Sequence, residues 1–97
     1  MQIQVDPQAI AEFCRRNHIR ELAFFGSVLR DDFRPDSDVD VLVEFEPGHT
    51  PGWNIVSMAD ELSPLVGGRS VDLRTFNELN WRFRDEVLSE AQVLYAA

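Results

Sequence analysis

Two acidic side chains at the start of an apolar strand are the residues of this sequence best suited to chemistry. Asp38 and Asp40 open the apolar run 39–45. Residues two apart on a strand point to the same face, about 6–7 Å apart, so both carboxylates can reach one metal centre. Gly26 and Ser27 end an earlier apolar run, and such a turn can present N–H groups and a hydroxyl to a phosphate. A metal site beside a phosphate-binding turn predicts metal-assisted phosphoryl or nucleotidyl transfer.

A third acid, Asp72, lies in the middle of another apolar run, 70–76. If the two acid-bearing strands are neighbours, three carboxylates converge on one face of the sheet. Hard oxygen ligands of this kind match Mg²⁺ or Mn²⁺. Arg74 shares the strand face of Asp72, and the sequence leaves open whether it pairs with that acid or reaches a phosphate.

Hydrophobic periodicity predicts the elements that must position these residues. Asp6-Pro7 is typical of a helix start, and Asn17-His18 can end that helix. A second helix begins at Asn54, and Pro64 should kink or end it. Strands are expected over 19–25, 39–45, 70–76 and 92–95, with one helical turn over 28–32 and a last helix over 78–89. This order predicts an α/β (α+β) fold, a small mixed β-sheet of about four strands with helices packed on one face.

Size and composition favour one domain that spans residues 1–97. The hydrophobic fraction of 44% is ordinary for a globular protein. No apolar stretch approaches the roughly 20 residues that span a bilayer, and no signal-peptide pattern is present. Cys14 is the single cysteine, which excludes an internal disulfide and fits a reducing compartment. We therefore expect a cytoplasmic protein with no membrane contact.

The charge of the chain limits its partners. The formal net charge is −8, and all nine basic residues are arginines. This balance argues against direct nucleic-acid binding, which relies on basic side chains that neutralise phosphates. Binding of a nucleoside triphosphate would need metal ions and local arginines to offset the repulsion. A basic or amphipathic protein partner is compatible with this charge.

The motif spacing resembles a known signature. Gly26-Ser27, ten intervening residues and Asp38-Val39-Asp40 are similar to the pattern of the polymerase-beta-like nucleotidyltransferase superfamily. The short length, together with Arg30 and segments 35–37 and 42–45, looks most like its minimal nucleotidyltransferase (MNT) branch. Members of that branch are commonly antitoxins paired with a helical HEPN-type toxin. The resemblance covers nearly the whole chain, and the spaced pattern is fairly specific although neither half would be so alone.

Carried over position by position, the resemblance implies a role for each matching residue. Asp38 and Asp40 would be catalytic metal ligands that hold the triphosphate. Asp72 would bind the catalytic metal and help activate the incoming hydroxyl. The cofactor implied is Mg²⁺, with two ions expected and Mn²⁺ as an alternative. The implied nucleotide contacts are Gly26, Ser27 and Arg30, the first two at the β- and γ-phosphates.

The function implied by this resemblance is an Mg²⁺-dependent nucleotidyltransferase that acts as an antitoxin. It would transfer AMP from ATP, or a nucleotide from another NTP, to a hydroxyl of a HEPN-type toxin, with Tyr the expected acceptor. This AMPylation would neutralise the toxin within a hetero-oligomeric toxin–antitoxin system. Two alternatives stay open: a non-catalytic antitoxin that neutralises its toxin by binding, and the nucleotide-binding subunit of a two-component transferase.

Other conspicuous residues fit structural roles. His18 and His49 are expected to be solvated surface residues rather than ligands or bases. Cys14 is expected to act as a small buried hydrophobe. Trp53 and Trp81 suit packing at the core edge, or anchors of a protein interface.

Overall fold

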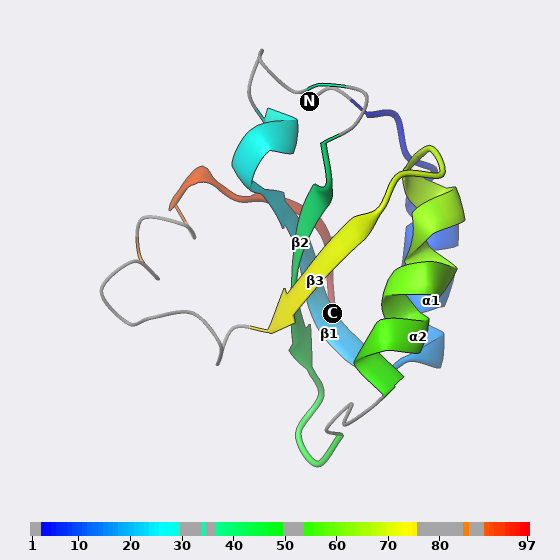
Figure 1. Ribbon diagram of the computed structural model, residues 1–97. Coiled ribbons are helices and arrows are strands. Elements are labelled where there is room, and N and C mark those ends of the chain that lie inside the picture. The colour runs from blue at the N-terminus through cyan, green and yellow to red at the C-terminus, as the bar shows by residue number, and fades with distance from the viewer. Residues whose placement is uncertain (1–2, 30–33, 35–36, 50–53, 76–84, 86–88) are drawn as a thin grey trace.

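The computed structural model describes residues 3–29, 34, 37–49, 54–75, 85 and 89–97, with the backbone alone at 27 and 28. Its elements in chain order are α1 (Pro7–Arg16), β1 (Ile19–Phe25), the 3₁₀ helix η1 (Gly26–Leu29), β2 (Val39–Phe45), α2 (Asn54–Leu62), the 3₁₀ helix η2 (Ser63–Val66), β3 (Val71–Thr75) and β4 (Gln92–Ala96). Within this part of the chain the sheet has four strands in the order β3-β2-β1-β4. β2 and β3 run parallel, whereas β1 is antiparallel to both β2 and β4. Both α1 and α2 lie on one side of the sheet (Figure 1), which confirms the predicted mixed sheet with helices on one face.

Helix α1 begins and ends where local chemistry directs it. The Asp6 carboxylate accepts a hydrogen bond of 3.0 Å from the Gln8 N–H, and Pro7 occupies the first turn. At the other end, the Asn17 side chain donates a hydrogen bond of 2.9 Å to the Phe13 carbonyl. The buried side chains of the helix are Ile10, Phe13 and Cys14. Asp6 and Asn17 therefore set the ends of α1, and its apolar residues set the face that is buried against the sheet.

The core lies between the two helices and the sheet. Side chains of successive register pairs of β1 and β2 point to opposite faces of the sheet. The pairs Phe24–Val41 and Leu22–Val43 face the helices and are fully buried. The same apolar cluster contains residues of both helices: Ile10, Phe13, Cys14, Met58 and Leu62. Burial raises the pKa of Cys14 to about 12, against the opposing effect of the Arg15 charge, and the thiol stays neutral. This confirms the prediction that Cys14 is a buried hydrophobe.

The segment from α2 to β3 has the helix end that Pro64 predicted. α2 ends at Leu62, and Pro64 lies in the 3₁₀ helix η2, because proline cannot donate the hydrogen bond that an α-helix requires there. Gly67 follows with φ +79°, the left-handed conformation that favours glycine. The Gly68 N–H then donates to the Ser63 carbonyl at 2.9 Å, which closes the turn before β3.

Some predicted elements differ from the structure or fall outside it. The helical turn expected over 28–32 is a 3₁₀ helix that begins two residues earlier, at Gly26, and 30–32 lie outside the described residues. Most of the helix expected over 78–89 also lies outside them, as do Trp53 and Trp81. None of the helices in the described part of the chain has the length and apolar character that a membrane crossing requires.

Candidate active site

Two of the predicted acids lie side by side on the face of the sheet away from the helices. In the parallel ladder, Asp40 of β2 is the register partner of Asp72 of β3. Neighbouring strands are about 4.8 Å apart, and register partners point to the same face, so the two carboxylates are close. Val39 and Val41, on either side of Asp40, are fully buried on the opposite face. Asp40 and Asp72 are half-buried, and solvent reaches both.

Gly26 brings the turn after β1 against the first of these acids. Antiparallel pairing places Phe25 opposite Asp40, so the chain leaves β1 directly beside the carboxylate. Gly26 has φ +73°, and a Cβ built on it would lie 2.3 Å from Oδ2 of Asp40. A Cβ at this position would displace the carboxylate, so glycine lets the turn backbone lie directly against Asp40.

Arg74 shares the acid-bearing face and pairs with Asp72. Its Nε lies 3.3 Å from Oδ1 of Asp72, and its Nη2 lies 3.4 Å from Oδ2. Of the two alternatives that the sequence left open, the structure therefore contains the pairing with the acid. Both side chains are substantially exposed, 51% for Arg74 and 40% for Asp72, so the pair contributes at most about 1 kcal/mol to stability. The effect of the pair is to orient the Asp72 carboxylate through the two contacts from Arg74.

The remaining predicted site residues are placed less fully. Asp38 directly precedes β2 and is exposed to solvent, at the end of the strand where Asp40 lies. The Ser27 side chain and the whole of Arg30 lie outside the described residues. The structure thus brings together Gly26, Asp40 and Asp72, with Asp38 at the edge of the group.

One feature of this face was missed from the sequence. Leu42 and its register partner Ala23 are on the acid-bearing face, yet Leu42 is 0% exposed and Ala23 is 2% exposed. Apolar side chains that are covered from solvent therefore adjoin the acids on this face. The signal was the unbroken run Val41-Leu42-Val43, which is typical of a strand buried on both faces.

The donor set of this face fits a divalent cation. Carboxylate oxygens on adjacent strands are the hard ligands that Mg²⁺ and Mn²⁺ prefer. The Arg74 guanidinium lies beside these acids and contacts both carboxylate oxygens of Asp72. Asp40 and Asp72 are therefore the residues that could hold such an ion, and the exposed Asp38 can join them.

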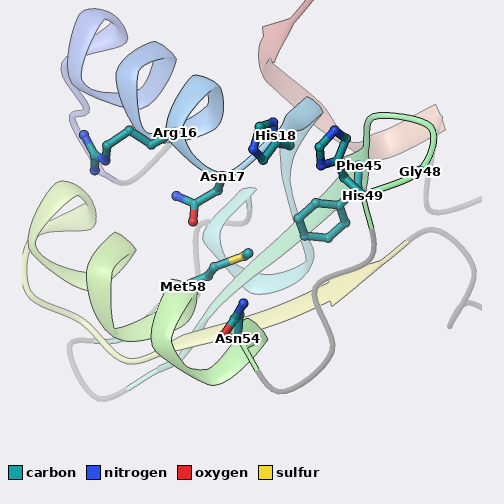
Figure 2. A pocket seen from close by; sticks show the side chains of 8 residues that line it. All are labelled: Arg16, Asn17, His18, Phe45, Gly48, His49, Asn54 and Met58. Carbon is teal, nitrogen blue, oxygen red and sulfur yellow. The ribbon is translucent and has the colours of Figure 1, made fainter.

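A second group of polar side chains lies at the opposite end of β1 and β2. Phe25 pairs with Asp40 at one end of this ladder and Ile19 pairs with Phe45 at the other, about 20 Å away by the rise of a strand. There, His18 and His49 are exposed, as expected, but their rings stack with centroids 3.9 Å apart. Both histidines line a pocket of about 300 Å³ that is separate from the acids. Figure 2 shows the two rings at one edge of it.

Comparison with known proteins identifies the family of this chain. Residues 7–94 match the model of the nucleotidyltransferase domain. Protein adenylyltransferase MntA of Thermococcus cleftensis is 36% identical over 80 residues, which cover 81% of this chain and 78% of the relative. A solved chain described as a minimal nucleotidyltransferase is 38% identical, with a TM-score of 0.71 over 88% of this chain and 85% of its own length.

A complex provides a further likeness at the level of the fold. An MNT antitoxin solved with the tri-AMPylated HEPN toxin of Shewanella oneidensis has a TM-score of 0.66 at 17% identity, over 94% of this chain and 70% of that one. The match to the domain model extends over nearly the whole chain and includes Gly26, Asp38, Asp40 and Asp72. The chain therefore belongs to the nucleotidyltransferase domain family.

Proposed function

We propose that this chain is an Mg²⁺-dependent protein adenylyltransferase that transfers AMP from ATP to a hydroxyl of a HEPN-type toxin and so acts as its antitoxin. The observation that carries the proposal is the contact of Gly26 with Asp40, with Asp72 on the adjacent strand. The likeness to protein adenylyltransferase MntA supports AMP as the transferred group. The fold shared with an antitoxin bound to an AMPylated HEPN toxin supports the class of acceptor.

In this proposal the acids hold the metal and the turn admits the nucleotide. Asp38, Asp40 and Asp72 supply the oxygen ligands. When bound, divalent ions neutralise the triphosphate and stabilise the charge that develops on the attacking and leaving oxygens. Gly26 lets the turn backbone lie against the Asp40 carboxylate, so a metal-bound triphosphate held by the acid would lie beside the turn. Ser27 and Arg30 are proposed as further contacts of the phosphates.

The reaction forms one bond and breaks another at the α-phosphorus of ATP. The acceptor oxygen, proposed to be that of a tyrosine, attacks the α-phosphorus, and the bond to the bridging oxygen of the β-phosphate breaks. Pyrophosphate leaves, and AMP remains on the acceptor. Asp72 is proposed to take the hydroxyl proton, with its carboxylate oriented by the two contacts from Arg74. The acceptor hydroxyl would be positioned by the docking of the toxin on this chain.

The proposal is tested by incubating the chain with a HEPN-type toxin of the same organism, ATP and Mg²⁺, followed by intact-mass measurement of the toxin. Wild type should add AMP to the toxin, whereas Asp40→Asn and Asp72→Asn should not. Glu44→Gln is a matched control, because it removes an acid from the same strand and face as Asp40, where Glu44 lies 3.8 Å from Arg20 instead.

The same assay separates the alternatives. Neutralisation of the toxin by wild type without any adduct would contradict adenylyl transfer and favour an antitoxin that acts by binding. Transfer to a small acceptor in place of the toxin would favour a subunit of a two-component transferase. Equal adduct formation by wild type and Asp40→Asn would refute the assignment of the site.

A further inference from the structure

Three side chains that commonly bind metals meet at the end of the sheet remote from the acids. They are His18, after α1, with Glu46 and His49, both after β2. One ligand atom from each lies within 4.8 Å of the other two, and Nδ1 of His18 is 3.9 Å from Oε2 of Glu46. All three side chains reach solvent, so an ion can enter without opening the core.

Backbone hydrogen bonds hold these three positions together. The Glu46 N–H donates to the His18 carbonyl at 2.8 Å, and the His49 N–H donates to the Glu46 carbonyl at 3.0 Å. The end of α1 and the turn after β2 are thus tied at the residues that carry the side chains. The cluster therefore has a fixed backbone and movable side chains.

The conformation of His18 is a second, independent observation. His18 has φ 56°, and it is the only non-glycine residue with positive φ in the described part of the chain. It follows Asn17, the C-cap of α1, at the position where helices usually place glycine. Histidine adopts this conformation more often than most residues, yet glycine would adopt it without strain. The chain thus accepts a backbone cost to place an imidazole at this point.

We propose that His18, Glu46 and His49 form a binding site for a divalent transition-metal ion of the Zn²⁺ class, distinct from the nucleotide site. Two imidazole nitrogens and one carboxylate oxygen suit Zn²⁺ and related ions, whereas Mg²⁺ prefers oxygen ligands alone. The two sites therefore differ in the ion that they select.

The side chains reach ligand geometry by rotation about their own side-chain bonds, with the backbone in place. Bonds of about 2.0–2.2 Å to a tetrahedral ion place ligand atoms about 3.3 Å apart, so ligand atoms within 4.8 Å of one another need to approach by at most roughly 1.5 Å. The stacked rings, inclined by 11°, must turn out of their stack because imidazole lone pairs lie in the ring planes. The side chains of His18 and Glu46 are 53% and 45% exposed, so they can rotate without disturbing the core.

The pocket in Figure 2 gives the ion an open side. His18 and His49 line it at one edge, with Asn54 and Met58 of α2 across from them. Three protein ligands leave a fourth tetrahedral position, which the pocket can fill with water or with an oxygen of a small anion. The site is therefore expected to hold the ion through three protein ligands and to leave one coordination position for an exchangeable ligand.

The test is a calorimetric titration of the full chain with Zn²⁺ while saturating Mg²⁺ occupies the acids. Wild type should bind one Zn²⁺ with a Kd in the micromolar range or lower. His18→Gly and His49→Gln should each weaken binding by about tenfold or more, the least expected when a direct ligand is removed. His18→Gly is the decisive variant, because glycine suits φ 56° and the protein should fold at least as well.

Two further measurements assign the ion to these residues. Glu46→Gln should weaken Zn²⁺ binding, whereas Glu44→Gln, a neighbouring acid outside the cluster, should leave the Kd unchanged. Because His18 and His49 are the only histidines of the chain, changes in imidazole NMR signals on addition of Zn²⁺ report on this site alone. Absence of Zn²⁺ binding by wild type in Mg²⁺, or a Kd of His18→Gly within about twofold of wild type, would overturn the proposal.

Discussion

Replacement of Gly26 by alanine tests the contact on which the proposed active site depends. The new Cβ would lie 2.3 Å from Oδ2 of Asp40 and 3.2 Å from its Cγ. The carboxylate must therefore move by roughly 1 Å to restore ordinary van der Waals contact. Alanine at φ +73° costs about 1–2 kcal/mol in addition, which would lower Tm by about 4–8 °C per kcal/mol in a chain of this size.

The expected result is a large loss of activity with a modest loss of stability. A displacement of about 1 Å at a reacting centre can lower the rate about 100-fold, so Gly26→Ala should reduce AMP transfer by that order. Gly67→Ala is the matched control, because Gly67 has φ +79° but no atom lies within 4 Å of the Cβ position. It should lose similar thermal stability and keep its activity.

Transfer rates by quantitative mass spectrometry, with melting curves of both variants, provide the measurement. Activity of Gly26→Ala within about threefold of Gly67→Ala would refute the reasoning, because the shared backbone strain would then account for the whole effect.

Three further predictions concern other parts of the structure. Asp6→Ala should remove the N-cap of α1 and lower the free energy of unfolding by about 1 kcal/mol in thermal denaturation. Asp6→Asn should retain most of the stability that the cap contributes. Burial raises the pKa of the Cys14 thiol to about 12 from 9.0, so the stability that it contributes is complete below about pH 9 and declines as the pH rises toward 12. In urea unfolding, wild type should therefore lose up to about 1.4 kcal/mol per pH unit more than Cys14→Ala across that range, and equal losses would contradict it. Arg74→Gln should change the free energy of unfolding by less than about 1 kcal/mol, because its pair with Asp72 is half-exposed; a larger loss would show that the pair is structural.

Much of the fold could be predicted because local signals agreed with tertiary packing. The strand 19–25 and the strand 39–45 have the bounds that their apolar runs indicated. Helix α1 follows its Asp-Pro start, and α2 stops just before the segment that contains Pro64. These boundaries depend on side-chain periodicity, caps and the missing N–H of proline, all of which are written in short stretches of sequence.

The arrangement of the acids and the glycine turn could not be predicted from local patterns, because it depends on contacts between distant segments. Adjacency of Asp40 and Asp72 required β2 and β3 to be parallel neighbours in one particular register, which no local pattern specifies. The contact of Gly26 with Asp40 likewise follows from the antiparallel register of β1 and β2. The metal-binding roles of these acids stay predictions.

The histidine cluster could not be found from sequence for the same reason. His18 and His49 are 31 positions apart, and their stack arises because β1 and β2 form a long hairpin-like pair that returns the chain to the end of α1. Each residue alone has the composition and setting of an ordinary surface histidine. The one local hint was His18 at the end of a helix, where glycine is usual.

The most direct test of the central claim is a calorimetric titration of ATP in the presence and absence of Mg²⁺. Wild type and Glu44→Gln should bind ATP only with Mg²⁺, and Asp40→Asn should lose that binding while keeping the melting behaviour of a folded chain. ATP binding that is equally strong without Mg²⁺, or unchanged in Asp40→Asn, would contradict a metal–nucleotide site at Asp40 and Asp72.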